Sequence, residues 1–153
     1  MVKTLTNPFV GGPVPLGTLL TAAGRRISTE LDAALRAAGF ADVRAAHAPL
    51  FMAIEPEGCS VTVLAERTRM TKQAVGELIR HLTERGYLQV APDPADKRVR
   101  RVTLTERGWQ VVEAGERVVA EFDAWLAAQL GADRVDQLRE TLTMIADTEP
   151  AER

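Results

Sequence analysis

The feature that most constrains the fold of this chain is a pair of closely spaced helical patterns between residues 62 and 86. Thr62 is a good N-cap for a short helix, whose apolar residues are Val63, Leu64 and Ala65. Thr71 is the next good N-cap, and the residues after it predict one buried helical stripe: Val75, Leu78, Ile79 and Leu82. Gly86 ends the second pattern. Helix, tight turn and helix form the helix-turn-helix pattern, whose second helix enters the DNA major groove in such modules.

The second helix carries polar residues on the side opposite its apolar stripe: Gln73, Glu77, Arg80 and Glu84. Residues near the N-terminus of a recognition helix reach base edges, which nominates Lys72 for guanine and Gln73 for adenine. Thr71 is expected to offer its hydroxyl to a phosphate. Gly76 costs a helix roughly 1 kcal/mol against alanine, which suggests close approach of DNA or of a neighbouring helix. The alternative is an amphipathic helix with an ordinary solvated face.

Two short β-like runs, 87–90 and 99–104, follow this helix. They are joined by a segment with two prolines and two aspartates, which predicts a turn. The second half of this hairpin is strongly cationic, with Lys97, Arg98, Arg100 and Arg101. Alternation along a strand places Arg98 and Arg100 on one face and Arg101 on the other. A cationic hairpin beside a helix-turn-helix is typical of a wing, suited to phosphates or to a narrow minor groove.

Several of these motifs closely resemble the MarR (multiple-antibiotic-resistance regulator) family over about residues 58–110. The match includes the segments 70–75 and 82–87, and the wing signature of that family is intact as Asp96-Lys97-Arg98 followed by Leu104-Thr105-Glu106-Arg107-Gly108. The resemblance implies a dimeric winged-helix transcription factor, commonly a repressor released by a small phenolic or lipophilic ligand or by oxidation. It also implies that the arginine matching Arg98 reaches the minor groove and that the aspartate matching Asp96 helps to fix the wing.

The expected fold is therefore mainly α with a small β-hairpin wing (α+β). Residues 1–153 form a single domain in this interpretation, with a winged helix-turn-helix at 58–104 and dimerisation helices at 16–38 and 106–148. The expected DNA-binding residues are Thr71, Lys72, Gln73, Gly76, Arg80, Asp96, Lys97, Arg98 and Arg100.

The flanking segments predict long helices that a winged helix does not itself need. Apolar residues keep helical spacing over 16–38, and Thr105 caps a second long helix that ends near Gly131. A shorter helix over 43–54 contains Pro49, which should kink or restart it. The last helix carries the narrow apolar seam of a helix–helix interface: Val135, Leu138, Leu142 and Ile145. Both chain ends are therefore expected to form a homodimer interface.

The irregular N-terminal stretch, residues 1–15, is either a disordered tail or an arm laid across the partner subunit. No signal peptide and no run of about 20 apolar residues is present, and there is one cysteine, so we expect a cytoplasmic protein without membrane contact.

Charge is divided unevenly along the chain, although the formal net charge is only −2. Residues 60–110 carry ten Lys/Arg and six Asp/Glu, a net charge of +4, whereas the remainder carries nine against fifteen, a net charge of −6. A basic module on acidic helices is the charge distribution expected of a dimer with one DNA-facing side.

Few residues suggest other chemistry. No catalytic triad order, glycine-rich phosphate loop, paired carboxylates or metal-ligand spacing is evident, so we expect no enzyme, metal or cofactor. Cys59 is either an oxidant sensor or, as we favour, a buried structural residue. His47, Phe51 and Trp109 are candidate contacts for a small lipophilic or phenolic effector, with ordinary packing as the alternative.

Two functions remain after these exclusions. The first is a sequence-specific regulator, the repressor that the resemblance implies, acting as a homodimer on pseudo-palindromic double-stranded DNA. The second is a winged-helix module for non-specific DNA architecture or for protein–protein contacts. The intact wing signature and the Lys72/Gln73 pair favour the first.

Overall fold

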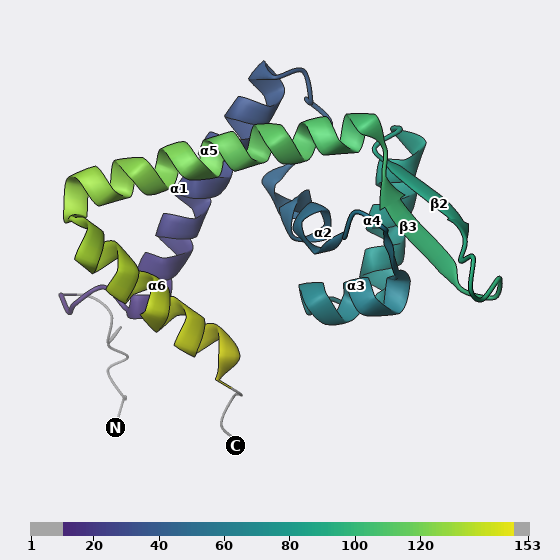
Figure 1. Ribbon diagram of the computed structural model, residues 1–153. Coiled ribbons are helices and arrows are strands. Elements are labelled where there is room, and N and C mark those ends of the chain that lie inside the picture. The colour runs from purple at the N-terminus through teal and green to yellow at the C-terminus, as the bar shows by residue number, and fades with distance from the viewer. Residues whose placement is uncertain (1–10, 149–153) are drawn as a thin grey trace, which may run out of the picture.

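The computed structural model describes residues 11–148, in which one long helix, α5 (Glu106–Leu130), connects two parts of the molecule (Figure 1). At one end of α5 a small sheet and helices α2, α3 and α4 form a compact lobe; α1 crosses α5 near its middle, and α6 folds back from its other end. In chain order the remaining elements are α1 (Leu16–Ala37), a 3-10 turn η1 (Ala45–His47), α2 (Ala48–Ala53), β1 (Cys59–Ser60), α3 (Val61–Thr68), α4 (Lys72–Glu84), β2 (Leu88–Pro92), β3 (Arg100–Leu104) and α6 (Ala132–Asp147). This architecture confirms the predicted mainly α fold with a β-hairpin wing.

The start of α3 differs from the prediction, because Ser60 and not Thr62 is its N-cap. The Ser60 hydroxyl accepts a hydrogen bond from the backbone N–H of Val63 at 3.3 Å, and Thr62 lies inside the helix. The difference arises because β1 pairs with β3, which holds Ser60 opposite Arg101 in extended conformation just before the helix. The strand β1 comprises only Cys59 and Ser60.

The predicted caps Thr71 and Thr105 and the glycine stop Gly86 agree with the structure, whereas the helix predicted over 43–54 is a 3-10 turn (Ala45–His47) followed by α2 (Ala48–Ala53). Thr71 caps α4 through the N–H of Ala74 at 3.1 Å, and Thr105 caps α5 through the N–H of Gly108 at 3.1 Å. Gly86 follows the end of α4 with φ +76°, a conformation that favours glycine. Pro49 occupies the first turn of α2, where its missing N–H is harmless, so the chain restarts there as predicted.

The sheet has the strand order β1-β3-β2, with β3 paired antiparallel to both neighbours. Pro92 is therefore accommodated at the end of an edge strand, as its missing donor requires. Gly58, with φ +80°, packs so closely on β3 that a Cβ would lie 2.6 Å from the Val102 carbonyl oxygen. Only glycine fits this approach of the β1 turn to the wing.

The core of the lobe lies between α2, α3, α4, the sheet and the first turns of α5. Tyr87 is its largest fully buried side chain, and the rings of Phe40 and Phe51 meet it edge-on at centroid distances of 6.2 and 6.3 Å. The predicted stripe of α4 is confirmed for Val75, Ile79 and Leu82, which are buried, while Leu78 is partly exposed. Helix packing against this core, rather than helix propensity, fixes the orientation of α4.

The helices outside the lobe leave much of their apolar surface exposed. In the predicted seam of α6, Val135 is buried, whereas Leu138, Leu142 and Ile145 are 42%, 39% and 50% exposed. Apolar residues of α1 and of the end of α5 are exposed as well: Leu16, Leu19, Leu20, Ile27 and Leu130. No helix within residues 11–148 is long and apolar enough to cross a membrane.

An exposed contact joins α6 to the lobe. Arg69, which ends α3 in the left-handed conformation with φ 54°, donates to the carbonyl oxygen of Ala146 and pairs with Asp147 at 3.0 Å. Ala146 and Asp147 lie at the C-terminal end of α6, where a helix carries partial negative charge.

Of the predicted irregular segment 1–15, residues 1–10 lie outside the described part of the chain, and residues 11–15 are not helical.

Gly108 and Gly115 lie on the same helix and predict opposite responses to alanine. A Cβ at Gly108 would overlap the carbonyl oxygen of Tyr87, whereas a Cβ at Gly115 meets nothing within 4 Å. We expect Gly108→Ala to destabilise the fold by about 1–3 kcal/mol, and Gly115→Ala to stabilise it by about 0.5–1 kcal/mol through helix propensity. Thermal unfolding at one fixed protein concentration measures both, and a stable Gly108→Ala protein would contradict this account of the lobe–α5 junction.

Candidate nucleic-acid interface

The junction between α3 and α4 sets the angle at which α4 is presented. Arg69 adopts the left-handed conformation, and the N–H of Met70 returns to the carbonyl oxygen of Ala65 at 3.1 Å, which closes the end of α3. Thr71 is then extended and starts α4. Leu64 of α3 and Val75 of α4 are each 0% exposed, so the two helices are locked together by their apolar faces.

The predicted recognition face of α4 is exposed to solvent. Gln73 and Arg80 on this face and Lys72 on its flank are all exposed, and Gln73 donates to Glu77 at 3.3 Å. A Cβ at Gly76 would meet nothing within 4 Å, so no neighbouring helix explains this glycine. Of the two uses predicted for Gly76, close approach of a DNA backbone is the one that the structure leaves open.

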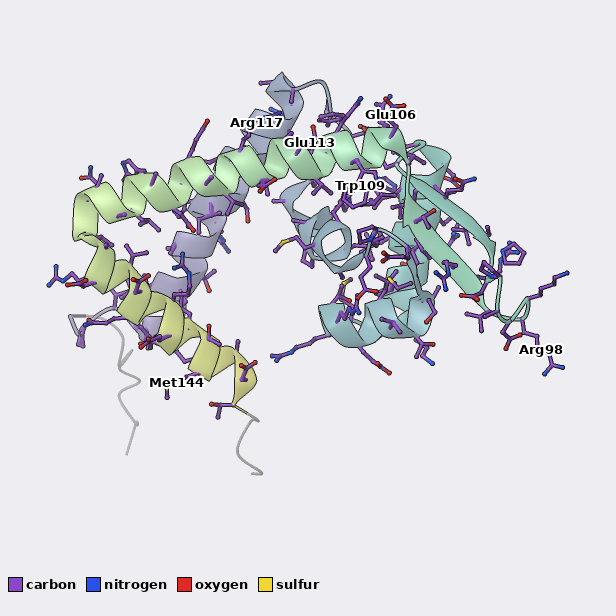
Figure 2. The ribbon with its side chains drawn as sticks, viewed as in Figure 1. Arg98, Glu106, Trp109, Glu113, Arg117 and Met144 are labelled. Atoms are coloured by element: carbon purple, nitrogen blue, oxygen red, sulfur yellow. The ribbon has the colours of Figure 1, made fainter. Side chains whose placement is uncertain are left out.

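The wing presents its cations in two different ways. Arg98 lies at the tip and points away from the body of the protein (Figure 2), after a turn in which Asp96 accepts from the N–H of Arg98 at 3.0 Å. Across residues 11–148, no ion pair involves Lys72 of the recognition helix or any of three hairpin cations: Lys97, Arg98 and Arg100.

Arg101 is the exception among the hairpin cations. Its guanidinium pairs with Asp93 at 2.7 Å and donates to the carbonyl oxygen of Glu57 at 2.8 Å. The predicted alternation of the strand had placed Arg101 on the face opposite Arg100, but the part played by Asp93 was missed. The sequence did offer a signal for this pair. Ala91 is the cross-strand partner of Arg101, and Asp93 follows Ala91 by two residues, at the start of the turn.

A second candidate site is a cavity of about 310 Å³ between α1, α2 and α5. Its wall is mostly apolar, with Arg44 and Glu116 as its charged residues; the others are Leu31, Leu35, Val43, Ala48, Phe51, Met52, Val111, Val112, Gly115 and Val119. Of the three effector contacts expected from the sequence, Phe51 lines this cavity, but His47 and Trp109 do not. The structure therefore does not bring the three residues together.

His47 faces the recognition helix instead. Its ring centroid lies 5.3 Å from that of His81 on α4, and its Nδ1 accepts from the backbone N–H of Arg44 at 3.2 Å. The reason is that His47 belongs to the 3-10 turn and Phe51 to α2, so the two side chains do not follow one α-helical phase. Trp109, near the start of α5, is 36% exposed (Figure 2).

A larger cavity of about 470 Å³ lies between α1, α5 and α6. It is lined mainly by apolar residues of the three helices, and Leu31 and Val119 belong to the walls of both cavities. Its floor continues into the exposed seam of α6, since Leu138 and Leu142 line it.

Cys59 is buried, and its thiol donates to the carbonyl oxygen of Ala53 at 3.9 Å. Burial raises the pKa of this thiol, against smaller opposing effects of a backbone hydrogen bond and of Arg67. A buried thiol with a raised pKa is a poor nucleophile toward oxidants, which favours the structural interpretation of Cys59. Residues 11–148 contain no group of three or more His, Cys, Asp or Glu that could hold a metal ion.

Comparison with known proteins identifies the family. The sequence model of the MarR family matches residues 41–99. Over 128 residues the chain is 30% identical to the HTH-type transcriptional repressor Rv2887 of Mycobacterium tuberculosis, covering 84% of this chain and 91% of that relative. The chain belongs to the MarR family. Because this family consists of transcription regulators and not of enzymes, the predictions of a MarR-like regulator and of a non-enzyme are confirmed.

Solved structures share the fold of this MarR-family chain. The transcriptional repressor CouR bound to a 23-mer DNA duplex superposes with a TM-score of 0.73 at 22% identity, covering 86% of this chain and 92% of CouR. The Staphylococcus aureus MepR–DNA complex gives a TM-score of 0.73 at 20% identity, covering 88% of this chain and 98% of MepR. CouR from Rhodococcus jostii bound to p-coumaroyl-CoA gives 0.68 at 24% identity, with 90% and 95% covered. At these identities the likeness shows the fold alone.

The position of His47 predicts a pH-dependent stability. Burial lowers the pKa of His47, and the neighbouring His81 lowers it further. At a pH below about 6.5 the unfolded chain therefore binds a proton at His47 more readily than the folded protein does, so the free energy of unfolding falls as the pH drops below that value. We expect His47→Asn, which retains an acceptor for the Arg44 N–H but does not titrate, to show a smaller drop in Tm between about pH 7.5 and about pH 5.5. Equal drops in the two proteins would contradict this assignment.

Proposed function

We propose that this protein is a cytoplasmic, homodimeric repressor that binds a pseudo-palindromic operator in double-stranded DNA. The observation that carries the proposal is the set of exposed cations on α4 and at the wing that form no ion pair within residues 11–148, beside Arg101 of the hairpin, which is paired with Asp93. Winged-helix residues 58–104 form the DNA-binding module, and the helices of 16–38 and 106–148 form the dimer interface. The relatives named as transcriptional repressors and the DNA-bound structural neighbours support this assignment.

In the proposed complex α4 lies in the major groove. Lys72 and Gln73 are at its N-terminal end, where side chains reach base edges, and Thr71 offers its hydroxyl to a phosphate. The open side of Gly76, where a Cβ would meet nothing within 4 Å, and the cation of Arg80 face the DNA backbone. The wing lies along the adjacent minor groove, with Arg98 inserted and with Lys97 and Arg100 on the flanking phosphates.

Dimerisation supplies a second recognition helix, which binds the second half-site. The exposed apolar residues of α1, the end of α5 and α6 are too extensive for a monomer that remains in water, and they adjoin the cavity between these helices. A second copy covering this surface relates two α4 helices by a two-fold axis, which requires an inverted repeat whose half-sites are about one helical turn apart.

We also propose that the cavity between α1, α2 and α5 takes a small effector with a lipophilic or phenolic body. Phe51 is one of its walls, and Arg44 is a cation on its rim with no ion pair across residues 11–148. A free cation at the edge of an apolar wall suits a ligand that carries an anionic group. One structural neighbour, CouR, is described as bound to p-coumaroyl-CoA, an anionic ligand with a phenolic ring.

The test of the main proposal is selection of bound duplexes from a random pool at near-physiological salt, because low salt lets phosphate contacts alone mimic binding. Enrichment of an inverted repeat is the expected result, and binding without enrichment would favour the architectural alternative. A second selection with Gln73→Ala should relax preference at particular base pairs by about 1–3 kcal/mol if Gln73 reads bases. A uniform loss at all sequences would make Gln73 a positioning contact.

Arg98→Ala should weaken binding to the selected duplex roughly tenfold, because one groove-inserted cation and its phosphate contacts are lost. Arg117→Ala is the matched control, since Arg117 is an exposed arginine on α5, away from the wing (Figure 2). Fluorescence anisotropy at several salt concentrations measures both variants. Equal affinities for Arg98→Ala and the unmodified protein would remove the wing from the proposed interface.

A further inference from the structure

The wing tip is organised around one carboxylate, that of Asp93. Its Oδ1 accepts from the backbone N–H groups of Ala95 at 2.8 Å and Asp96 at 3.3 Å, so it shapes the turn that precedes Arg98. Its Oδ2 accepts a hydrogen bond from Arg101 Nε at 2.8 Å and forms an ion pair with Arg101 Nη2 at 2.7 Å. Two backbone N–H groups and one guanidinium therefore converge on this one side chain. Within residues 11–148, the carboxylate of Asp96, the aspartate of the family signature, accepts from a single donor, the N–H of Arg98.

Arg101 extends the same connection to the body of the lobe. Its Nη1 donates to the carbonyl oxygen of Glu57 at 2.8 Å, just before the close approach of Gly58 to β3. In that approach a Cβ on Gly58 would come within 3.0 Å of the Arg101 Cγ, so the stem of Arg101 is also confined. The guanidinium thus ties the β1 turn on one side of β3 to the wing tip on the other.

The pair is more sheltered than the cations around it. The side chain of Asp93 is 14% exposed and that of Arg101 is 33% exposed. The hydrogen bond from Arg101, followed by that from the Ala95 N–H, lowers the pKa of Asp93, so the carboxylate stays charged at neutral pH. All three guanidinium nitrogens of Arg101 have partners within the protein, so few of its N–H donors remain for a phosphate.

We propose that Asp93 and Arg101 are positioning residues for DNA binding. They fix the conformation of the wing tip, so that Arg98 and its neighbouring cations are already oriented for contact with the minor groove. The inference rests on the proposed DNA-binding function, because it concerns how the wing is held and not whether DNA is bound. Order at the tip matters because a mobile wing must lose conformational entropy when it binds, and a preorganised one has already lost it.

The sign of one effect separates positioning from simple electrostatics. Asp93 is a negative charge close to the proposed DNA surface, so its removal alone should tighten binding. If Asp93 positions the wing, its removal should weaken binding instead. Glu84→Gln provides the matched control, because Glu84 is exposed on the proposed DNA-facing side of α4 and makes no side-chain hydrogen bond or ion pair within residues 11–148.

Affinity for the duplex recovered by selection should then fall roughly tenfold for Asp93→Ala, about the loss of one groove or phosphate contact, and stay equal or rise for Glu84→Gln. Asp93→Asn retains an oxygen for the turn N–H groups but loses the charge facing Arg101, and we expect an intermediate loss. An affinity of Asp93→Ala as high as that of Glu84→Gln would overturn the proposal.

A double-mutant cycle tests whether Asp93 acts through Arg98. In an Arg98→Ala background, Asp93→Ala should cost much less than tenfold, and the slope of affinity against salt should change little further, because the same contact is already gone. Losses that simply add would show that Asp93 does not position Arg98, and would overturn the proposal in that form.

Trypsin cleavage of the free protein at Lys97 and Arg98 gives a readout that needs no DNA. We expect faster cleavage at these two bonds in Asp93→Ala than in Glu84→Gln, with equal rates elsewhere, because the tip has lost its internal support. Unchanged cleavage at the wing would overturn the positioning role. Failure of the unmodified protein to bind any duplex would instead overturn the proposed function. The cleavage result would still show whether Asp93 orders the wing tip.

Discussion

The DNA-binding lobe depends on the burial of Tyr87. Its ring fills the space between Phe40 and Phe51, and its hydroxyl donates to Asp42 at 2.5 Å and accepts from Arg107 at 3.0 Å. Its backbone carbonyl accepts from the N–H of Thr105 at 3.1 Å. One residue therefore joins the segment after α1, the root of the wing and the start of α5. A buried hydroxyl is stable only with partners, so removing any of these contacts would affect all three segments.

Local chemistry made most of the fold predictable from the sequence. Helix caps such as Thr71 and Thr105, and a C-terminal glycine such as Gly86, act within a few residues and were placed correctly. Ser60 was missed as a cap because its role depends on a strand partner some forty positions away, Arg101. The face to which His47 points was missed because a 3-10 turn breaks the helical phase. Such errors come from tertiary pairing, which no local pattern contains.

The candidate site divides in the same way. The cations of the recognition helix and wing were predictable, because their residue types and spacing follow a DNA-binding pattern, and their contacts with DNA stay predictions. Of the residues that line the cavity between α1, α2 and α5, only Phe51 was predicted, since the shape of the cavity depends on how three helices meet. Phe51 is shared between that cavity and the packing of Tyr87, so the wall of the cavity touches the side chain at the root of the wing. This adjacency places the wall of the proposed effector site in contact with the DNA-binding lobe.

The length of α5 has a mechanical consequence. A helix of 25 residues, Glu106–Leu130, is about 37 Å long at 1.5 Å per residue. It runs from the lobe to α6 and contributes residues to the walls of both cavities. A stiff rod of that length is a lever: a tilt of about 5° at one end moves the other by about 3 Å. Displacements of one to a few ångströms are the scale on which interfaces change between discrete packings. If the proposed effector tilts α5 by a few degrees, the recognition helix and the wing move by about 3 Å, a distance comparable to the length of a hydrogen bond.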